Sequence, residues 1–288
     1  MTNEIDWVRV AEPQSDAYDT HVALQLASST TDAVRTTVHR RPSPRQSEPT
    51  IFDGAVAVRA SGPGAAGVAT FSGGPSDAPV IEDAVQRVRA WPEAFRQFQS
   101  LMHAFYPVVD SNVAAADPGR GSCSHSVESA IGEMYATVFD PIGLAEAFVH
   151  EMAHNKLRAL GVYVGTPGRF FLNPRHVLYP SPALKTRLRP MSAVFHAEYS
   201  FIYVTQLDIV MLRAECDPNQ RAHLLGVLAT NVERMDWGLD IVRDFAELDD
   251  DGATFMRGFY AWAERVLNEG RRELRRQRRL HAAPGVPL

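Results

Sequence analysis

Cysteine is scarce in this chain of 288 residues. Cys123 and Cys216 are the only two, which is too few for a disulfide framework or a cysteine-rich zinc module. No apolar run approaches the roughly 18 residues of a membrane span, and the acidic first residues lack the basic and apolar parts of a secretion signal. We therefore expect a soluble, cytoplasmic protein with no membrane partner.

A large charge excess is also missing. The formal net charge is −5, so the chain as a whole carries no basic footprint for nucleic acid or a membrane surface. The exception is the segment 271–279, which holds six arginines. A run of this kind suits the solvated end of a helix, where the helix dipole favours cations, as well as it suits nucleic acid. We favour the solvated helix end and expect no nucleic-acid partner.

The chain does contain two histidines four residues apart. His150 and His154 enclose Glu151 in the spacing H-E-x-x-H. On a helix, residues at i and i+4 lie one above the other, so both imidazoles can bind one metal ion. A bare match of this kind also arises by chance, on an ordinary amphipathic helix with two surface histidines. The surrounding sequence has to distinguish these two interpretations.

Local signals place the motif on a helix. Asp140 is a favourable N-cap, Pro141 suits the first helical position, and Gly161 stands where a helix often ends. They predict a helix of roughly five turns with the two histidines in its middle. The preceding segment, Ile131–Phe139, has the composition of a strand of mixed burial. A strand feeding a metal-binding helix is also the arrangement of a zinc-peptidase core.

Helical periodicity dominates the rest of the chain. We predict a mainly α fold, with a helical metal-binding core and a small β-sheet preceding the H-E-x-x-H helix. The periodic segments lie around residues 21–26, from 80 to 105 with a break at Pro92, from Met191 to Leu212, and at about 220–248 and 252–279. Residues 81–288 form the predicted catalytic domain. Residues 1–80 form the predicted N-terminal arm or small accessory region, with short β-prone pieces and a Pro- and Arg-rich linker at Arg35–Thr50.

A catalytic metal ion needs a third protein ligand, and the common peptidase layouts do not supply one here. The metzincin pattern requires glycine at position 157 and histidine at position 160, where this chain has Leu157 and Leu160. The thermolysin-like pattern requires a glutamate some 20 residues after the motif. Between Glu151 and Glu198 the chain has no Asp or Glu. Both layouts are therefore disfavoured.

Three candidates for the third ligand remain: His176, His196 and Glu198. His196 and Glu198 are about 200° apart around a helix, so both cannot face one ion. His176 lies between two prolines in a predicted loop. His196 shares a helical face with Tyr199, which would give the ligand a partly polar, aromatic wall. The position of His196 suits equally well a buried histidine whose hydrogen bonds are made within the core. The spacing therefore leaves open whether His196 is a metal ligand or a core residue.

A longer pattern extends from the motif to the segment around His196. It consists of His150-Glu151-Met152-Ala153-His154-Asn155-Lys156-Leu157, Tyr179-Pro180-Ser181-Pro182, Arg189-Pro190, and Val194-Phe195-His196 with Tyr199 and Phe201. This combination resembles the H-E-x-x-H family of peptide-modification proteins, over about residues 122–205. The chain departs from that family at Ala183, where tryptophan is usual, and at Ala197, where glycine is usual. Substrate choice is the property that these departures affect most.

The resemblance implies an iron(II)- and 2-oxoglutarate-dependent oxygenase, with O₂ as co-substrate, that hydroxylates a β-carbon in a ribosomally made precursor peptide. His150, His154 and His196 would then bind the metal, in an octahedral shell with room for the keto acid and O₂. The far carboxylate of 2-oxoglutarate needs a cationic fork, for which Arg189 is the first candidate and Arg187 the second.

Under this interpretation Tyr199 would belong to the cofactor site. Glu151 would not activate water. It would instead orient a ligand, bind the metal or hold the peptide.

Two other interpretations remain. In a zinc metallopeptidase, Glu151 would activate a metal-bound water as the general base, and Arg189 would have no necessary role. In a non-catalytic helical peptide-binding protein, the metal site would be degenerate and no metal would bind. The three interpretations differ in whether a metal binds, in which metal it is and in the role of Glu151, so the arrangement of these residues in the fold is informative.

Overall fold

The computed structural model describes residues 4–29, 48–60, 69–70, 78–109, 123–165, 167–183 and 186–282. The helices are α1 (Trp7–Val10), α2 (Tyr18–Ser29), α3 (Ala78–Arg89), α4 (Pro92–Leu101), α5 (Pro141–Ala159), α6 (Met191–Ala214), α7 (Pro218–Phe245) and α8 (Asp250–Ala282). The strands are β1 (Thr50–Ile51), β2 (Val56–Val58), β3 (Ala69–Thr70), β4 (Ala104–Val109), β5 (Ser124–His125), β6 (Glu133–Thr137), β7 (Tyr179–Pro180) and β8 (Leu188–Arg189). The fold is mainly α with a small sheet, as predicted.

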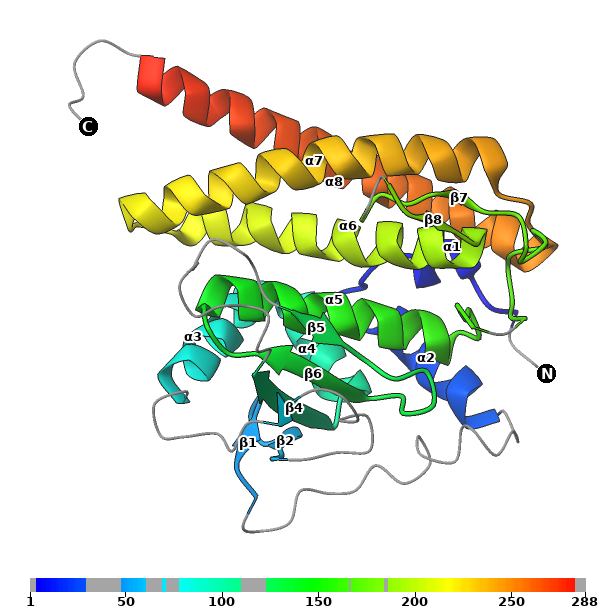
Figure 1. Cartoon of the computed structure of the whole chain (residues 1–288), viewed down its shortest axis with the longest axis horizontal. Coiled ribbons are helices and arrows are strands. Elements are labelled where there is room, and N and C mark those ends of the chain that lie inside the picture. Colours follow the sequence, from blue (N-terminus) through cyan, green and yellow to red (C-terminus); the bar gives the residue numbers. More distant parts are fainter. Residues whose placement is uncertain are drawn as a thin grey trace.

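The small sheet has the order β1-β2-β4-β6-β5, with β3 also paired to β4. Its central strands β2, β4 and β6 are parallel, whereas β1, β3 and β5 pair antiparallel with their neighbours. β7 and β8 form a separate antiparallel pair in which Tyr179 stands opposite Arg189. In Figure 1 the sheet lies on one side of α5 and the helices α6, α7 and α8 lie on the other.

The H-E-x-x-H helix, α5, begins and ends where the sequence predicts. The carboxylate of Asp140 accepts a hydrogen bond of 2.7 Å from the backbone N–H of Gly143. Gly161 follows the helix with φ +89°, a backbone conformation that glycine adopts without strain. β6 leads directly into the helix, within the segment 131–139 that was predicted as a strand. Local chemistry therefore sets both ends of the helix that carries the motif.

α5 is buried on nearly all sides. α6 packs on one face, while α3, α4 and the sheet pack on the other. Toward the sheet, Phe148 meets the rings of Phe52, Phe98 and Phe105 edge-on at centroid distances of 5.2–5.4 Å. Such packing restrains the helix and its side chains. The two histidines of the motif therefore stand on one of the best-supported elements of the fold.

One predicted helix is wrong at its end. The helical pattern was extended through Phe105, but α4 ends at Leu101 and Phe105 belongs to β4. β4 is a parallel strand paired with strands on both sides, and its described side chains are buried. A short, continuously apolar run of this kind has no period that separates a strand from a buried helix.

The N-terminal segments join the main core. α1 packs against α8, and α2 packs against α4 and α5. Trp7, Val22 and Phe52 belong to the same hydrophobic cluster as Phe148. The boundary predicted near residue 80 therefore runs through a shared core. The linker predicted at Arg35–Thr50 lies largely outside the described residues, which resume at Glu48.

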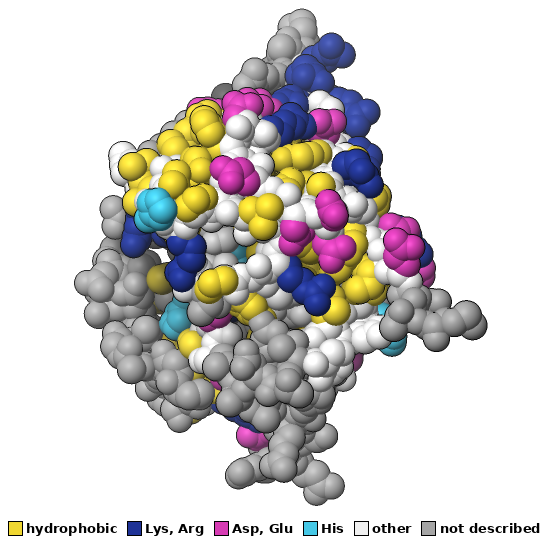
Figure 2. Space-filling view, turned by 90° about the vertical axis from the view of Figure 1, so that its right-hand side faces the viewer, with side chains coloured by type: hydrophobic (Ala, Val, Ile, Leu, Met, Phe, Trp, Pro, Cys, Tyr) yellow, Lys and Arg dark blue, Asp and Glu magenta, His cyan; other side chains and the backbone are white. Residues whose placement is uncertain are grey.

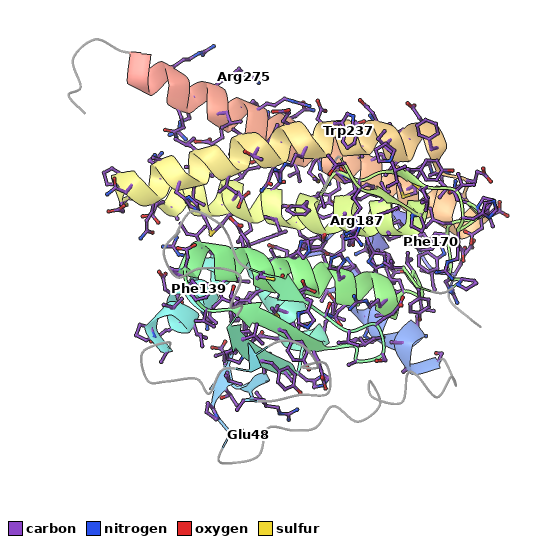
Figure 3. All side chains as sticks on the ribbon, viewed as in Figure 1. Glu48, Phe139, Phe170, Arg187, Trp237 and Arg275 are labelled. Carbon is purple, nitrogen blue, oxygen red and sulfur yellow. The ribbon has the colours of Figure 1, made fainter. Side chains whose placement is uncertain are left out.

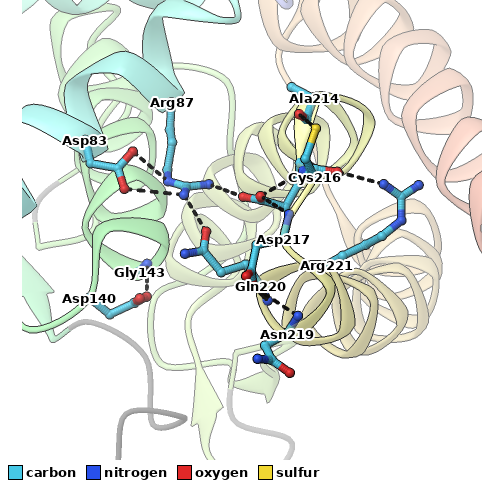
Figure 4. A network of polar contacts seen from close by, with 11 residues as sticks. Asp83, Arg87, Asp140, Gly143, Ala214, Cys216, Asp217, Asn219, Gln220 and Arg221 are labelled. Atoms are coloured by element: carbon cyan, nitrogen blue, oxygen red, sulfur yellow. Dashed lines mark hydrogen bonds and ion pairs between the residues drawn. The ribbon is translucent and has the colours of Figure 1, made fainter. Parts of the chain in front are cut away.

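An arginine joins α3 to the turn between α6 and α7. Arg87 pairs with Asp83 one turn earlier, and it donates to Glu215 at 3.1 Å and to Gln220 at 2.6 Å (Figure 4). The guanidinium is largely buried, so these charge-assisted hydrogen bonds are not screened by bulk water. They connect α3 to the end of α6 and the start of α7. His196 lies at the opposite end of α6.

Apolar side chains reach the surface at the end of the molecule that carries β7 and β8. The exposed ones there are Leu172, Val177, Leu178, Leu188 and Phe245. Figure 2 faces this end and shows apolar side chains gathered among charged ones. In the described part of the chain, no helix combines the length and apolar character that crossing a bilayer requires. At the opposite end, Arg275 points outward from the last turns of α8 (Figure 3).

Candidate functional site

The fold brings His196 to the two motif histidines. Nε2 of His154 lies 3.0 Å from Nε2 of His150, and Nδ1 of His154 lies 3.1 Å from Nδ1 of His196. His150 and His154 come from α5, and His196 comes from the first turns of α6, which packs along it. Of the three candidates for a third ligand, His196 is the one that the structure places beside the pair.

The other two candidates lie elsewhere. His176 is exposed in the loop before β7. Glu198 is fully buried against α7, where a Cβ on Gly238 would come within 2.1 Å of its carboxylate oxygen, so glycine provides the room that Glu198 occupies. Burial raises the pKa of Glu198 well above its usual range, and Asp236 and Asp240 add to this. Neither residue contacts the histidine cluster.

A backbone carbonyl orients His196. Its Nε2 lies 3.0 Å from the carbonyl oxygen of Val162, which directly follows the helix-ending Gly161. A carbonyl only accepts hydrogen bonds, so Nε2 carries the proton and Nδ1 is left with its lone pair. The free lone pair is the one beside His154. A metal-binding histidine is oriented by the same kind of contact at its other ring nitrogen.

The three imidazoles are held neutral. Burial lowers the pKa of His150, and it lowers the pKa of His154 well below its usual range with help from the two neighbouring histidines. Burial together with the charge of Arg158 lowers the pKa of His196 to about 3. A metal ligand must be the unprotonated imidazole. The surroundings therefore favour the form that binds metal.

As they stand, the three rings do not direct three nitrogens to one point, because His154 turns a different nitrogen toward each neighbour. No group of three His, Cys, Asp or Glu side chains in the described ranges is placed to hold an ion. A half-turn of the His154 ring would exchange Nε2 with Cε1, the atom bonded to both ring nitrogens. The chemistry of the donor set, three neutral imidazoles, suits a metal ion, but a common point would also require His150 and His196 to approach each other.

The histidines line a cavity of about 890 Å³ between α5, α6 and α7. Four polar side chains of α5 border it at steps of four residues, which places them in one stripe along the helix. In chain order they are Glu146, His150, His154 and Arg158. From other elements Ser124, Arg189, His196, Phe201 and Arg234 also line it. A cavity of this size suits a small ligand together with a side chain of a larger one.

Arg189 and Arg187 differ in position, although they are two residues apart. Arg189 lines the cavity from β8, and within the described ranges its guanidinium has no ion-pair or side-chain hydrogen-bond partner. Burial, and then the charge of Arg187, lowers the pKa of Arg189. Arg187 is exposed and does not line the cavity; Figure 3 shows it beside α6. The first of the two predicted arginines is the one that the fold directs inward.

Glu151 lies behind the cavity wall and is not one of its lining residues. The carboxylate is almost fully buried, and it accepts hydrogen bonds from the hydroxyls of Ser124 at 2.8 Å and Ser126 at 2.5 Å. Arg158 in turn donates to the Ser126 hydroxyl at 2.7 Å. Both carboxylate oxygens are therefore engaged in joining α5 to the segment around β5. In this arrangement Glu151 orients a cavity-lining arginine and serine rather than facing a bound ligand.

Tyr199 is not brought to the cavity. It is fully buried, with its ring 5.3 Å from Tyr203 and 5.7 Å from Trp262 of α8. The prediction of a tyrosine wall beside His196 assumed that residues at i and i+3 share surroundings. Here Tyr199 and Tyr203 pack in an aromatic cluster with Trp262 of α8, while the His196 ring lies beside His154 of α5.

Sequence reasoning missed Glu146, Arg158 and Arg234 as cavity residues. A signal was present for two of them, because Glu146 and Arg158 continue the four-residue spacing of the motif to either side. Arg234 lies on α7, and nothing local connects it to the motif. No protein-family model and no curated protein matches the chain. The family resemblance therefore remains a prediction.

Proposed function

We propose that this chain is an iron(II)- and 2-oxoglutarate-dependent oxygenase that hydroxylates a β-carbon of a residue in a ribosomally made peptide. The observation that carries the proposal is Arg189, a cation without an anionic partner among the described residues, which opens into the same cavity as three neutral histidines. The combination suits a metal ion and a small anion bound side by side. The peptide, the iron and a cytoplasmic location are parts of this proposal.

The residues that would hold the metal are His150, His154 and His196. Neutral imidazoles and open positions are what a non-haem iron site uses. When bound, iron(II) with O₂ and 2-oxoglutarate supplies the chemistry that replaces a C–H bond by C–OH, while the keto acid becomes succinate and CO₂. Val162 fixes the His196 ring through its carbonyl and so keeps the Nδ1 lone pair directed at the cluster.

The arginines suit a dicarboxylate. Arg189 is free to make a bidentate contact with the far carboxylate of 2-oxoglutarate. Arg158 also lines the cavity one turn beyond His154, and part of its hydrogen-bonding capacity is taken by Ser126. Two buried or half-buried cations near the histidines favour an anionic ligand over a neutral one. Phe201, whose ring lies 5.0 Å from that of His150, adds an apolar wall beside the histidines.

The zinc metallopeptidase is the alternative, and the position of Glu151 disfavours it. A general base must reach the water that it activates, directly or through one further water. Both oxygens of Glu151 instead accept hydroxyls, from Ser124 and Ser126, and Glu151 is not among the residues that line the cavity. A peptidase also leaves the partnerless Arg189 without a role.

An anaerobic titration tests the proposal. The metal-free protein is loaded with Fe(II), then 2-oxoglutarate is added, and the weak visible band of a chelated keto acid is monitored. We expect the band in the wild-type protein and a keto-acid affinity reduced by about tenfold or more in Arg189→Ala, because a charge-assisted bidentate contact is lost.

Arg187→Ala is the matched control, since it removes the same charge two residues away at an exposed position. It should leave the titration unchanged. If Fe(II) binds without any band, or if both variants weaken the band equally, the proposal is wrong. If Zn(II) supports peptide cleavage that depends on Glu151, the metallopeptidase takes its place.

A further inference from the structure

The charged side chains that α5 presents to the cavity differ in sign between its two ends. Arg158 and Arg189 lie close enough to lower the pKa of His154 through their charges, after burial and the neighbouring histidines. At the other end of the α5 stripe stands Glu146, four residues before His150 and eight before His154. At about 1.5 Å per residue, Glu146 lies about 6 Å along the helix from His150 and about 12 Å from His154. Glu146 and Arg158 thus stand at opposite ends of the α5 stripe, while Arg234 of α7 also lines the cavity.

Glu146 interacts with a second carboxyl group. Asp208 of α6 is fully buried behind it, within hydrogen-bonding reach, and Asp208 accepts a hydrogen bond of 2.9 Å from the side-chain amide of Asn231. Burial raises the pKa of Glu146 well above its usual range, and burial raises the pKa of Asp208 to about 7. Burial therefore favours the protonated forms, and a proton can lie between the two carboxyl groups; a cation bound beside them would favour the ionised form.

Glu146 has no ion-pair partner among the described residues, although Arg234 of α7 also lines the cavity. No arginine or lysine of the described ranges lies within ion-pair distance of Glu146, and the charged groups that act on it, Asp208 and Asp140, are acidic. Oε1 of Glu146 and Oδ1 of Asp208 are shut off from solvent, and apart from a proton shared between the two carboxyl groups they receive no donor from the described residues. One proton cannot satisfy every acceptor of two buried carboxyl groups, so a ligand that supplies further donors would be favoured.

We propose that Glu146, backed by Asp208, binds the basic side chain of a lysine or arginine in the peptide substrate and so determines which peptides the cavity accepts. The inference rests on the proposed function in taking a peptide as the substrate. An ammonium or guanidinium group supplies both the positive charge and the donors that this end of the cavity lacks. With about 3.3 Å per extended residue, the basic residue lies about two to four positions from the residue that faces the histidines.

A second metal ion suits these carboxyl groups less well. Mg²⁺ and Ca²⁺ need six or more oxygen ligands, of which the protein supplies several in a calcium site. Only Glu146 of the acidic pair lines the cavity, because Asp208 lies behind it. No three acidic or histidine side chains in the described part of the chain converge here.

The test is peptide selection by the full-length protein, without metal or keto acid. The probe is a random library of N-acetylated, C-amidated hexapeptides, passed over immobilised wild-type protein and variants, with the retained peptides sequenced by mass spectrometry. We expect the wild-type protein to enrich peptides that contain Lys or Arg, and Glu146→Gln to reduce that enrichment about tenfold or more. Glu146→Lys should reverse the preference toward Asp and Glu, a result that misfolding does not produce.

Glu82→Gln is the control, because it removes the same charge from an exposed position on α3. It should retain the wild-type selection. The inference is overturned if wild-type protein and Glu146→Gln retain the same peptides, if neither prefers basic ones, or if millimolar Mg²⁺ or Ca²⁺ occupies the wild-type site and not that of Glu146→Gln. The iron and 2-oxoglutarate titration of Glu146→Gln should match that of the wild-type protein. Failure of the oxygenase proposal would therefore show in the titration, and failure of this inference would show in the peptide selection.

Discussion

The ammonium group of Lys156 donates to the carboxylate of Asp19 at 2.5 Å, and both side chains are shut off from solvent. Lys156 stands two residues after His154 on α5, whereas Asp19 lies in the first turn of α2. Lys156 also donates to the hydroxyl of Tyr203 at 3.1 Å, and the amide of Gln97 donates to Asp19 at 2.5 Å. This buried network ties α2 to α5, the helix that carries His150 and His154.

Removing one member of that pair should destabilise the fold strongly. In Asp19→Asn the ammonium group of Lys156 stays buried without a countercharge, and breaking a buried pair in this way costs about 3–5 kcal/mol. Urea unfolding at neutral pH measures the change. Asp16→Asn is the control, since its pair with Arg9 is open to solvent and its loss should change the stability little. Equal effects of the two substitutions would contradict the structural role assigned to Lys156.

The histidines should differ in their effect on metal affinity according to their place in the fold. Replacing His154 or His196 by alanine should lower Fe(II) or Zn(II) affinity more than about a hundredfold, because removing a ligand costs more than disturbing the groups that orient it. His176→Ala, at an exposed position, should have no effect. Isothermal titration calorimetry of the metal-free proteins measures this. Wild-type affinity in His196→Ala would exclude it as a ligand.

Glu151→Gln should keep the metal and the keto-acid band. The amide still accepts one serine hydroxyl but leaves the other without its acceptor, so we expect a loss of stability of about 1–3 kcal/mol. Ser126→Ala should lose a similar amount of stability, because it removes the hydroxyl between Glu151 and Arg158. Thermal unfolding and the iron titration report the two properties separately. A Glu151→Gln protein that is stable and binds the metal but has lost all activity toward peptides would favour the metallopeptidase.

Acid should weaken the metal-free protein through His196. Its pKa in the folded state is about 3, against about 6.5 for an ordinary histidine. The stability linked to this difference is fully present above pH 6.5, and it is lost as the pH falls toward 3, because the unfolded chain takes up a proton that the folded chain refuses. His196→Gln should lose less stability than the wild-type protein between pH 7 and pH 5, measured by urea midpoints with a chelator present. An identical decline in both proteins would refute this.

Asp208 should act in the opposite direction. Its folded pKa of about 7 lies above the ordinary value of about 3.9. The associated stability is present below pH 4 and is lost as the pH rises through 7, because the unfolded chain releases its proton first. Asp208→Asn cannot ionise and should therefore show a flatter stability curve between pH 4 and pH 8. A curve as steep as that of the wild-type protein would mean that Asp208 is not the group responsible.

Local sequence determined the helix that carries the motif. The Asp140 cap, the proline after it and Gly161 act within one turn of backbone, so the ends of α5 follow from neighbouring residues. The same holds for the break between α3 and α4 at Pro92 and for the strand before α5. The four-residue spacing of His150 and His154 places them together on any helix.

Only the tertiary structure decided which distant residues join them. His196 lies beside His154 because α6 packs along α5. The same packing places the carboxyl group of Glu146 beside that of Asp208. Arg189 lines the cavity, whereas Arg187 is exposed and Tyr199 packs toward α8. From the sequence, all three were predicted to belong to one cofactor site. Capping and helical spacing depend on backbone geometry within a few residues. The site depends instead on which buried faces pack together, and that choice is made by the burial energy of the whole core.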